Sequence, residues 1–125
     1  IQAVVLSIKL SHLESWLEAR RKNAEIYNKL LADSGLLIPT APEHSRHTYH
    51  LYVVQVSNRE KVMAKLAEDG IDSGLHYPIA LPFLEAYADL GHQPSDFPVA
   101  HSQMDKILSL PMYAELTEEQ IERVC

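Results

Sequence analysis

The sequence of 125 residues contains a single cysteine, at its last position, Cys125. One thiol cannot form an intrachain disulfide or a thiolate-rich metal site, and this scarcity is typical of a reducing compartment such as the cytoplasm. Long hydrophobic runs are also missing, since no apolar stretch approaches the roughly 20 residues of a membrane-spanning helix. No segment has the pattern of a signal peptide. We therefore expect a cytoplasmic location and no membrane contact.

Positive charge is scarce as well. There are 11 Lys and Arg against 17 Asp and Glu, which gives a net charge of -6 with neutral histidines. Surfaces that bind nucleic acid need clustered positive charge, so we expect no nucleic-acid partner. The one basic run, Arg20-Arg21-Lys22, lies between Glu18 and Glu25 and is typical of a solvated helix face.

The four glycines are scattered as expected caps and turns, so they form no glycine-rich phosphate loop. The seven histidines show no metal-ligand spacing. His47 and His50, for example, are three residues apart, which on a strand places them on opposite faces. Ser109 lies between two leucines and outside any nucleophile-elbow motif. We expect neither a metal site nor a catalytic nucleophile in this chain.

Both ends of the chain fall inside helical patterns. The first residues carry no initiator methionine and no N-cap residue, and the chain stops at Cys125 without a C-cap residue. A length of 125 residues suffices for one domain with a real core but is short for a whole cofactor enzyme. The sequence therefore predicts a fragment of a longer protein.

The first 35 residues predict one long helix that connects two bodies. Apolar residues recur there at spacings of three, four or seven, which is typical of a single apolar helix face: Leu6, Leu10, Leu13, Leu17, Ala24, Tyr27 and Leu31. A helix from residue 1 to 33, ended by Gly35, would be about 50 Å long. Because this exceeds the width of a small domain, we assign 1–35 as a connecting helix.

The remaining sequence predicts short strands and helices in alternation. We expect strands at 47–56, 71–75 and 108–110, and helices at 59–68, 83–90, 101–107 and from 117 onward. Asn58 is an N-cap candidate, Gly70 a terminator, and Thr117 with Gln120 a capping box. This order predicts a small α/β domain of the α+β type over 36–125, with a mostly antiparallel sheet and helices on one face.

The segment from Gly70 to Pro78 is the best candidate for a binding site. It places His76 and Tyr77 side by side where the chain reverses, and Pro78 is expected to hold Tyr77 extended. An imidazole and a phenol can bind sugar hydroxyls or phosphate oxygens through hydrogen bonds. From the residues alone, filling a corner of the core is an equally good interpretation.

The same segment, together with the motifs around it, resembles the DegT/DnrJ/EryC1/StrS family of aminotransferases, which make amino sugars on nucleotide carriers. The resemblance spans the whole chain, and the order of its motifs is specific. The matching residues are I-Q-A at 1–3, Trp16, R-R at 20–21, A-x-x-Y ending at Tyr27, H-L-Y-V-V at 50–54, G-I at 70–71, H-Y-P at 76–78, D-F-P-V-A at 96–100, L-S-L-P-M-Y at 108–113 and L-T-E-E-Q-I at 116–121.

The resemblance implies the C-terminal domain of a type I transferase that depends on pyridoxal phosphate (PLP), with the large PLP-binding domain absent from this chain. It implies a homodimer that moves an amino group, usually from glutamate, to a ketosugar attached to a nucleoside diphosphate. The Schiff-base lysine of the family would lie upstream of Ile1. None of the six lysines here matches its motif, so we expect no catalytic and no cofactor-binding residue in this chain. His76 and Tyr77 are the expected substrate-binding residues.

One position departs from the family. Many members have H-Y-P-x-P-x-H, whose second histidine lines the sugar site, whereas Pro82 stands at that position here. The resemblance therefore assigns neither the nucleotide sugar nor the aminated ring carbon. Two alternatives remain: an autonomous small α/β module with a regulatory or ligand-binding role, and a relative, such as a sugar dehydratase or a regulator, that has lost the aminotransferase chemistry.

Overall fold

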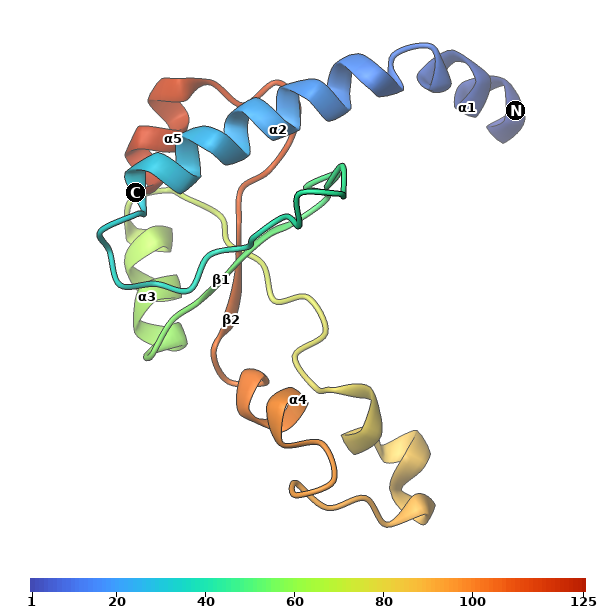
Figure 1. Cartoon of the computed structure of the whole chain (residues 1–125), viewed down its shortest axis with the longest axis vertical. Helices are drawn as coiled ribbons and strands as arrows, with labels where there is room; N and C mark the ends of the chain where they lie inside the picture. Colours follow the sequence, from blue (N-terminus) through green and yellow to red (C-terminus); the bar gives the residue numbers. More distant parts are fainter.

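A computed structural model describes all residues from 1 to 125, and its elements are shown in Figure 1. In chain order they are α1 (Gln2–Leu10), α2 (Leu13–Leu30), β1 (Tyr52–Gln55), α3 (Arg59–Glu68), the 3₁₀ helices η1 (Leu81–Phe83) and η2 (Glu85–Leu90), α4 (Pro98–Gln103), β2 (Ile107–Leu110) and α5 (Glu118–Val124). No helix is both long and apolar enough to cross a membrane.

The sheet is small and antiparallel, as predicted. β1 pairs with β2, with Tyr52 opposite Leu110. Single antiparallel bridges extend it at both edges, where Leu37 pairs with Gln55 and Gly74 pairs with Ser109. The predicted strands at 47–56 and 71–75 are therefore too long, since the second is reduced to the bridge at Gly74.

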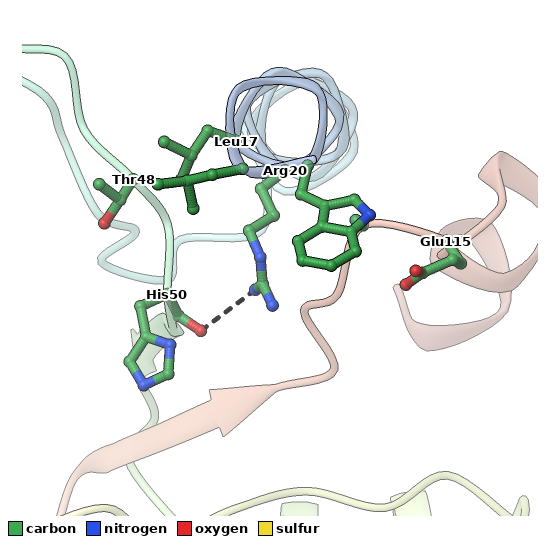
Figure 2. A pocket seen from close by; sticks show the side chains of 8 residues that line it. Leu17, Arg20, Thr48, His50 and Glu115 are labelled. Carbon is green, nitrogen blue, oxygen red and sulfur yellow. Dashed lines mark hydrogen bonds between the residues drawn. The ribbon is translucent and has the colours of Figure 1, made fainter. Parts of the chain in front are cut away.

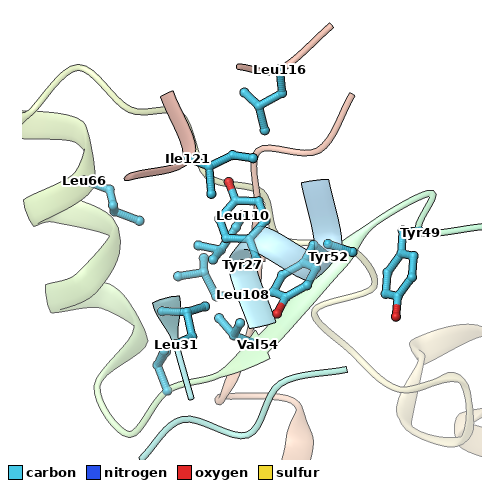
Figure 3. Close-up of a cluster of buried hydrophobic side chains, with 12 residues drawn as sticks. Tyr27, Leu31, Tyr49, Tyr52, Val54, Leu66, Leu108, Leu110, Leu116 and Ile121 are labelled. Carbon is cyan, nitrogen blue, oxygen red and sulfur yellow. The ribbon is translucent and has the colours of Figure 1, made fainter. Parts of the chain in front are cut away.

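One face of the sheet carries the core, and α2, α3 and α5 pack against that face. Side chains alternate along a strand, so residues at every second position of β1 and their partners on β2 point the same way. The buried cluster joins these strand residues to side chains of α2, α3 and α5 (Figure 3). Its members include Tyr52, Val54, Leu108, Leu110, Tyr27, Leu31, Leu66 and Ile121.

The predicted continuous helix over 1–33 is wrong, because the chain turns between α1 and α2. The Ser11 hydroxyl donates to the Ile8 carbonyl at 2.7 Å, and the His12 amide bonds back to Lys9 rather than to Ile8. A serine that bonds to its own helix competes with the helical hydrogen-bond pattern. The helix at the other end stops at Leu30, and Gly35 follows with φ 74° after a turn.

The central part of α2 is fixed by hydrogen bonds to three consecutive carbonyls after β2. The hydroxyl of Tyr27 donates to Pro111 at 2.9 Å, one guanidinium nitrogen of Arg20 donates to Met112 at 2.8 Å, and the amide of Asn23 donates to Tyr113 at 3.0 Å. Residues 20, 23 and 27 share one helix face. These side chains supply hydrogen-bond donors to the carbonyls of residues 111–113, which lie beyond the end of β2 and have no partner strand.

The predicted capping residues are confirmed. The Asn58 side chain accepts from the Lys61 amide, Thr117 and Gln120 form a reciprocal capping box, and Gly70 ends α3 with φ 73°. The boundaries are less accurate: the helix predicted at 83–90 is a pair of 3₁₀ helices, and the one predicted at 101–107 is α4, which begins earlier. Short segments carry too little periodicity to fix their ends.

The N-terminal apolar stripe is exposed. α1 buries no residue, and Leu6 and Leu10 are 65% and 68% exposed. In Figure 1, α1 extends away from the sheet and its helices. Only 14 of 125 residues are buried, so most of the apolar surface of α1 and of the first turn of α2 is available for contact with another body.

Candidate functional site

The candidate site begins where α3 ends. After Gly70 the chain runs to Gly74, which exchanges two backbone hydrogen bonds of 2.9 Å with Ser109 on β2. The chain then bends through residues 76–79 and enters η1. The bridge to the outer edge of β2 therefore positions the segment that carries His76 and Tyr77.

His76 is anchored to the strand. Its Nδ1 lies 2.8 Å from the Ser109 Oγ, and Ser109 is only 4% exposed. Nε2 has no hydrogen-bond partner in the chain, and the residue as a whole is exposed. The imidazole is thus held at one nitrogen and free to bind at the other.

Tyr77 does not adopt the expected extended conformation. Its φ is 57°, in the left-handed region, although a residue before proline normally favours extended backbone. A non-glycine residue there costs on the order of 1–3 kcal/mol, and such strain concentrates at functional sites. The bend between the Gly74 bridge and η1 imposes this conformation and leaves Tyr77 82% exposed.

The two side chains do not share one pocket. Tyr77 lines a hollow of about 700 Å³ whose other lining residues are 78–81 and Leu84. The hollow is almost entirely apolar, and His76 is not part of it. Pro82 stands in the first turn of η1. The structure therefore brings His76 to Ser109 and leaves Tyr77 beside an apolar surface, and a role of either residue in substrate binding stays a prediction.

A second hollow, of about 330 Å³, lies beside α2 (Figure 2). Arg20 extends beneath it, and the same nitrogen that bonds to Met112 also faces the carbonyls of Tyr49 at 3.2 Å and His50 at 3.3 Å. The hollow is lined by Leu13, Trp16, Leu17, Arg20, Thr48, His50, Ala114 and Glu115.

The prediction of a solvated basic face is therefore wrong for two of its three residues. Besides the bonds of Arg20, Arg21 donates from Nε to the His47 carbonyl at 3.1 Å and pairs with Glu18 at 3.1 Å. Only Lys22 is exposed. The loop before β1 crosses α2 and presents backbone carbonyls to it, which no local pattern reveals.

All six lysines are exposed, and Lys65 is paired with Glu68 and Asp69 on the surface of α3. No group of three His, Cys, Asp or Glu side chains is placed to hold a metal ion.

The strongest ionisation shifts lie in the core instead. Burial is the main cause that raises the pKa of Tyr27 and of Tyr52 well above the usual range. The two rings stack with centroids 4.7 Å apart, and the Tyr52 hydroxyl donates to Asn28 Oδ1 at 2.7 Å. These phenols are structural and remain neutral.

The whole chain, residues 1–125, matches the DegT/DnrJ/EryC1/StrS aminotransferase family, and it belongs to that family. A pleiotropic regulatory protein of Geobacillus stearothermophilus is 38% identical over 99% of this chain and 34% of its own length. A dTDP-3-amino-3,6-dideoxy-alpha-D-galactopyranose transaminase of Aneurinibacillus thermoaerophilus is 35% identical, over 99% of this chain and 34% of its own length.

Among solved structures, that of S. venezuelae DesV in complex with a ketimine intermediate superposes with a TM-score of 0.92 at 34% identity. The match covers 98% of this chain and 33% of that one. This chain therefore has the small α+β fold found within aminotransferases, and it spans about a third of the length of these relatives.

Sequence reasoning missed three residues of these sites. Ser109 was assigned to a buried strand, correctly, but its contact with His76 bridges 33 positions. Gly74 was placed in the predicted strand at 71–75 without a partner, and Arg20 was assigned to a solvated face. The one available signal was the L-S-L-P-M-Y motif itself, because a serine between leucines in a buried strand needs a hydrogen-bond partner.

Proposed function

We propose that this chain acts as the C-terminal third of a PLP-dependent aminotransferase that aminates a nucleotide-linked ketosugar, with glutamate as amino donor. The observation that carries the proposal is the match over residues 1–125 to one aminotransferase family, together with the close superposition on DesV, whose structure contains a ketimine intermediate. PLP supplies the chemistry of amino-group transfer when bound. Because none of the six lysines matches the family's Schiff-base motif, we assign PLP binding to the part of the protein outside this chain.

Within the full-length protein we propose that His76 and Tyr77 bind the sugar nucleotide. Two observations support this: His76 has one ring nitrogen fixed by Ser109 and the other free, and Tyr77 is strained and exposed. Exposed polar tips next to a sheet edge suit hydrogen bonds to sugar or phosphate oxygens. Neither residue acts as the general base, because the family resemblance implies that the Schiff-base lysine transfers the proton.

The test is to measure the two half-reactions of the full-length enzyme separately. His76→Ala or Tyr77→Phe should raise the KM for the ketosugar, with each lost hydrogen bond contributing about 0.5–1.5 kcal/mol, or up to about 3 if it reaches a phosphate. PLP binding and the glutamate half-reaction should be unchanged. Loss of thermal stability with normal sugar kinetics would show instead that the pair only fills space.

We further propose that the full-length protein is a cytoplasmic homodimer. The exposed stripe of α1 and α2 supports a large contact with another body. Sedimentation of the full-length protein would test the assembly, and a monomer at micromolar concentration would contradict it.

One observation favours a second candidate. The relative with 38% identity is named a regulatory protein, so the full-length protein could belong to a branch that regulates without transamination. The residue at the Schiff-base position of the full-length sequence decides between the two. A residue other than lysine there, with no transamination of any ketosugar, would support the regulator.

A further inference from the structure

Gly74 and Ser109 form a cradle for the His76 ring. Because they exchange both backbone hydrogen bonds, they lie directly opposite each other and their side-chain positions share one face of the sheet. Gly74 has no side chain, so the space next to the Ser109 hydroxyl is open. The His76 ring fills it.

The close fit leaves no room for a larger residue at position 74. A Cβ atom added to Gly74 would lie 2.8 Å from Cε1 and 3.1 Å from Nδ1 of His76. Glycine is therefore needed here for close approach of the ring, and any substitution must move the imidazole away from Ser109.

The contact also bears on which ring nitrogen carries the proton. A neutral imidazole is protonated at either Nδ1 or Nε2. If Nδ1 were protonated, it would donate to Ser109 Oγ, and the hydroxyl hydrogen of a residue that is 4% exposed would have no acceptor. Leaving a buried donor unsatisfied is unfavourable, which favours the arrangement in which the hydroxyl donates to Nδ1 and the proton resides on Nε2.

We propose that Ser109 and Gly74 are positioning residues that fix His76 in the Nε2-protonated tautomer, so that Nε2–H donates to an acceptor oxygen of the sugar nucleotide. The identity of the ligand in this inference rests on the proposed function, whereas the tautomer of His76 does not depend on it. The oxygen belongs either to the diphosphate or to the sugar, since both offer acceptors.

The tautomer is tested without any substrate. Nitrogen-15 NMR of the full-length protein with labelled histidine, at about pH 8 where an unperturbed imidazole is neutral, distinguishes the protonated from the unprotonated ring nitrogen. The signals of His76 are those missing from His76→Gln. We expect a protonated Nε2 in the wild type and a mixture of tautomers in Ser109→Ala. A protonated Nδ1 in the wild type, or an unchanged spectrum in Ser109→Ala, would overturn the proposal.

The ligand contact is tested by kinetics on the same variants. Ser109→Ala and Gly74→Ala should raise the KM for the ketosugar nucleotide about 2- to 10-fold, as expected for one weakened hydrogen bond, and leave the glutamate half-reaction unchanged. Ser109→Thr, which keeps the hydroxyl, should restore the KM. The matched control is Ser102→Ala, which removes a hydroxyl that bonds only to the Val99 carbonyl.

Binding of the free nucleoside diphosphate identifies the acceptor. If Ser109→Ala weakens binding of the free nucleoside diphosphate, the acceptor oxygen belongs to the diphosphate. If only the ketosugar nucleotide binds more weakly, the acceptor oxygen belongs to the sugar. If His76→Gln leaves the KM for the ketosugar and diphosphate binding unchanged, the ligand contact and the proposed role of His76 are both wrong, even where the NMR result confirms the tautomer.

Discussion

Replacing Arg20 by alanine should loosen the loop before β1, because Arg20 attaches that loop to α2 beside the bond from Arg21 to His47. One guanidinium nitrogen faces the carbonyls of Tyr49, His50 and Met112. That nitrogen has two hydrogens, so we count two hydrogen bonds and not three. Bonds from a charged donor contribute about 1.5–3 kcal/mol each, but solvent screening at a half-exposed site reduces the sum. We expect a loss of about 2 kcal/mol.

Hydrogen exchange measured by mass spectrometry on the full-length protein reports this loss locally. The Tyr49 amide is a suitable probe because it donates to His47 Nδ1 at 3.0 Å. A loss of about 2 kcal/mol corresponds to roughly thirtyfold faster exchange of residues 47–50. Arg20→Lys should show a smaller effect, since an ammonium group can still reach one carbonyl.

Lys22→Ala is the matched control, because Lys22 lies two residues further along the same helix and is exposed. It should leave exchange in residues 47–50 unchanged. Equal exchange rates in Arg20→Ala, Lys22→Ala and the wild type would refute the assignment of Arg20 as the attachment of this loop.

Three further predictions concern the core, the apolar stripe and the cofactor. Burial raises the folded-state pKa of Tyr27 and Tyr52. The neutral phenols therefore contribute fully to stability below the unfolded-state pKa of about 10. As the pH rises above that value, the free energy of unfolding should fall by up to about 1.4 kcal/mol per pH unit for each phenol. Urea unfolding at alkaline pH should show a shallower loss in Tyr27→Phe, and identical slopes would contradict the assignment. The 125-residue chain expressed alone should self-associate through its exposed stripe, and Leu6→Gln with Leu10→Gln should reduce this in sedimentation; a concentration-independent monomer would argue against it. The same chain should bind no PLP, and an absorbance band that borohydride fixes on one of its lysines would disprove this.

The fold could be predicted where one local rule determines it. The caps at Asn58 and Thr117 are confirmed, because a side-chain oxygen next to free helix amides needs only a few neighbouring residues. The buried strand at 108–110 and the antiparallel sheet are also confirmed, although no local rule determines which strands pair. The boundaries of β1 and of the 71–75 segment were wrong, since pairing with a partner strand decides where a strand ends.

The sequence by itself thus determined the family, the approximate order of helices and strands, and the segment in which a site was expected. Only the tertiary structure decided the contacts of that segment: His76 meets Ser109 across 33 positions, and Arg20 meets Met112 across 92. Tyr77 likewise takes a left-handed backbone that its proline neighbour disfavours. Local preferences extend over a few residues, whereas a hydrogen bond between distant segments exists only once strands and helices have brought a donor and an acceptor to within 3 Å or so of each other.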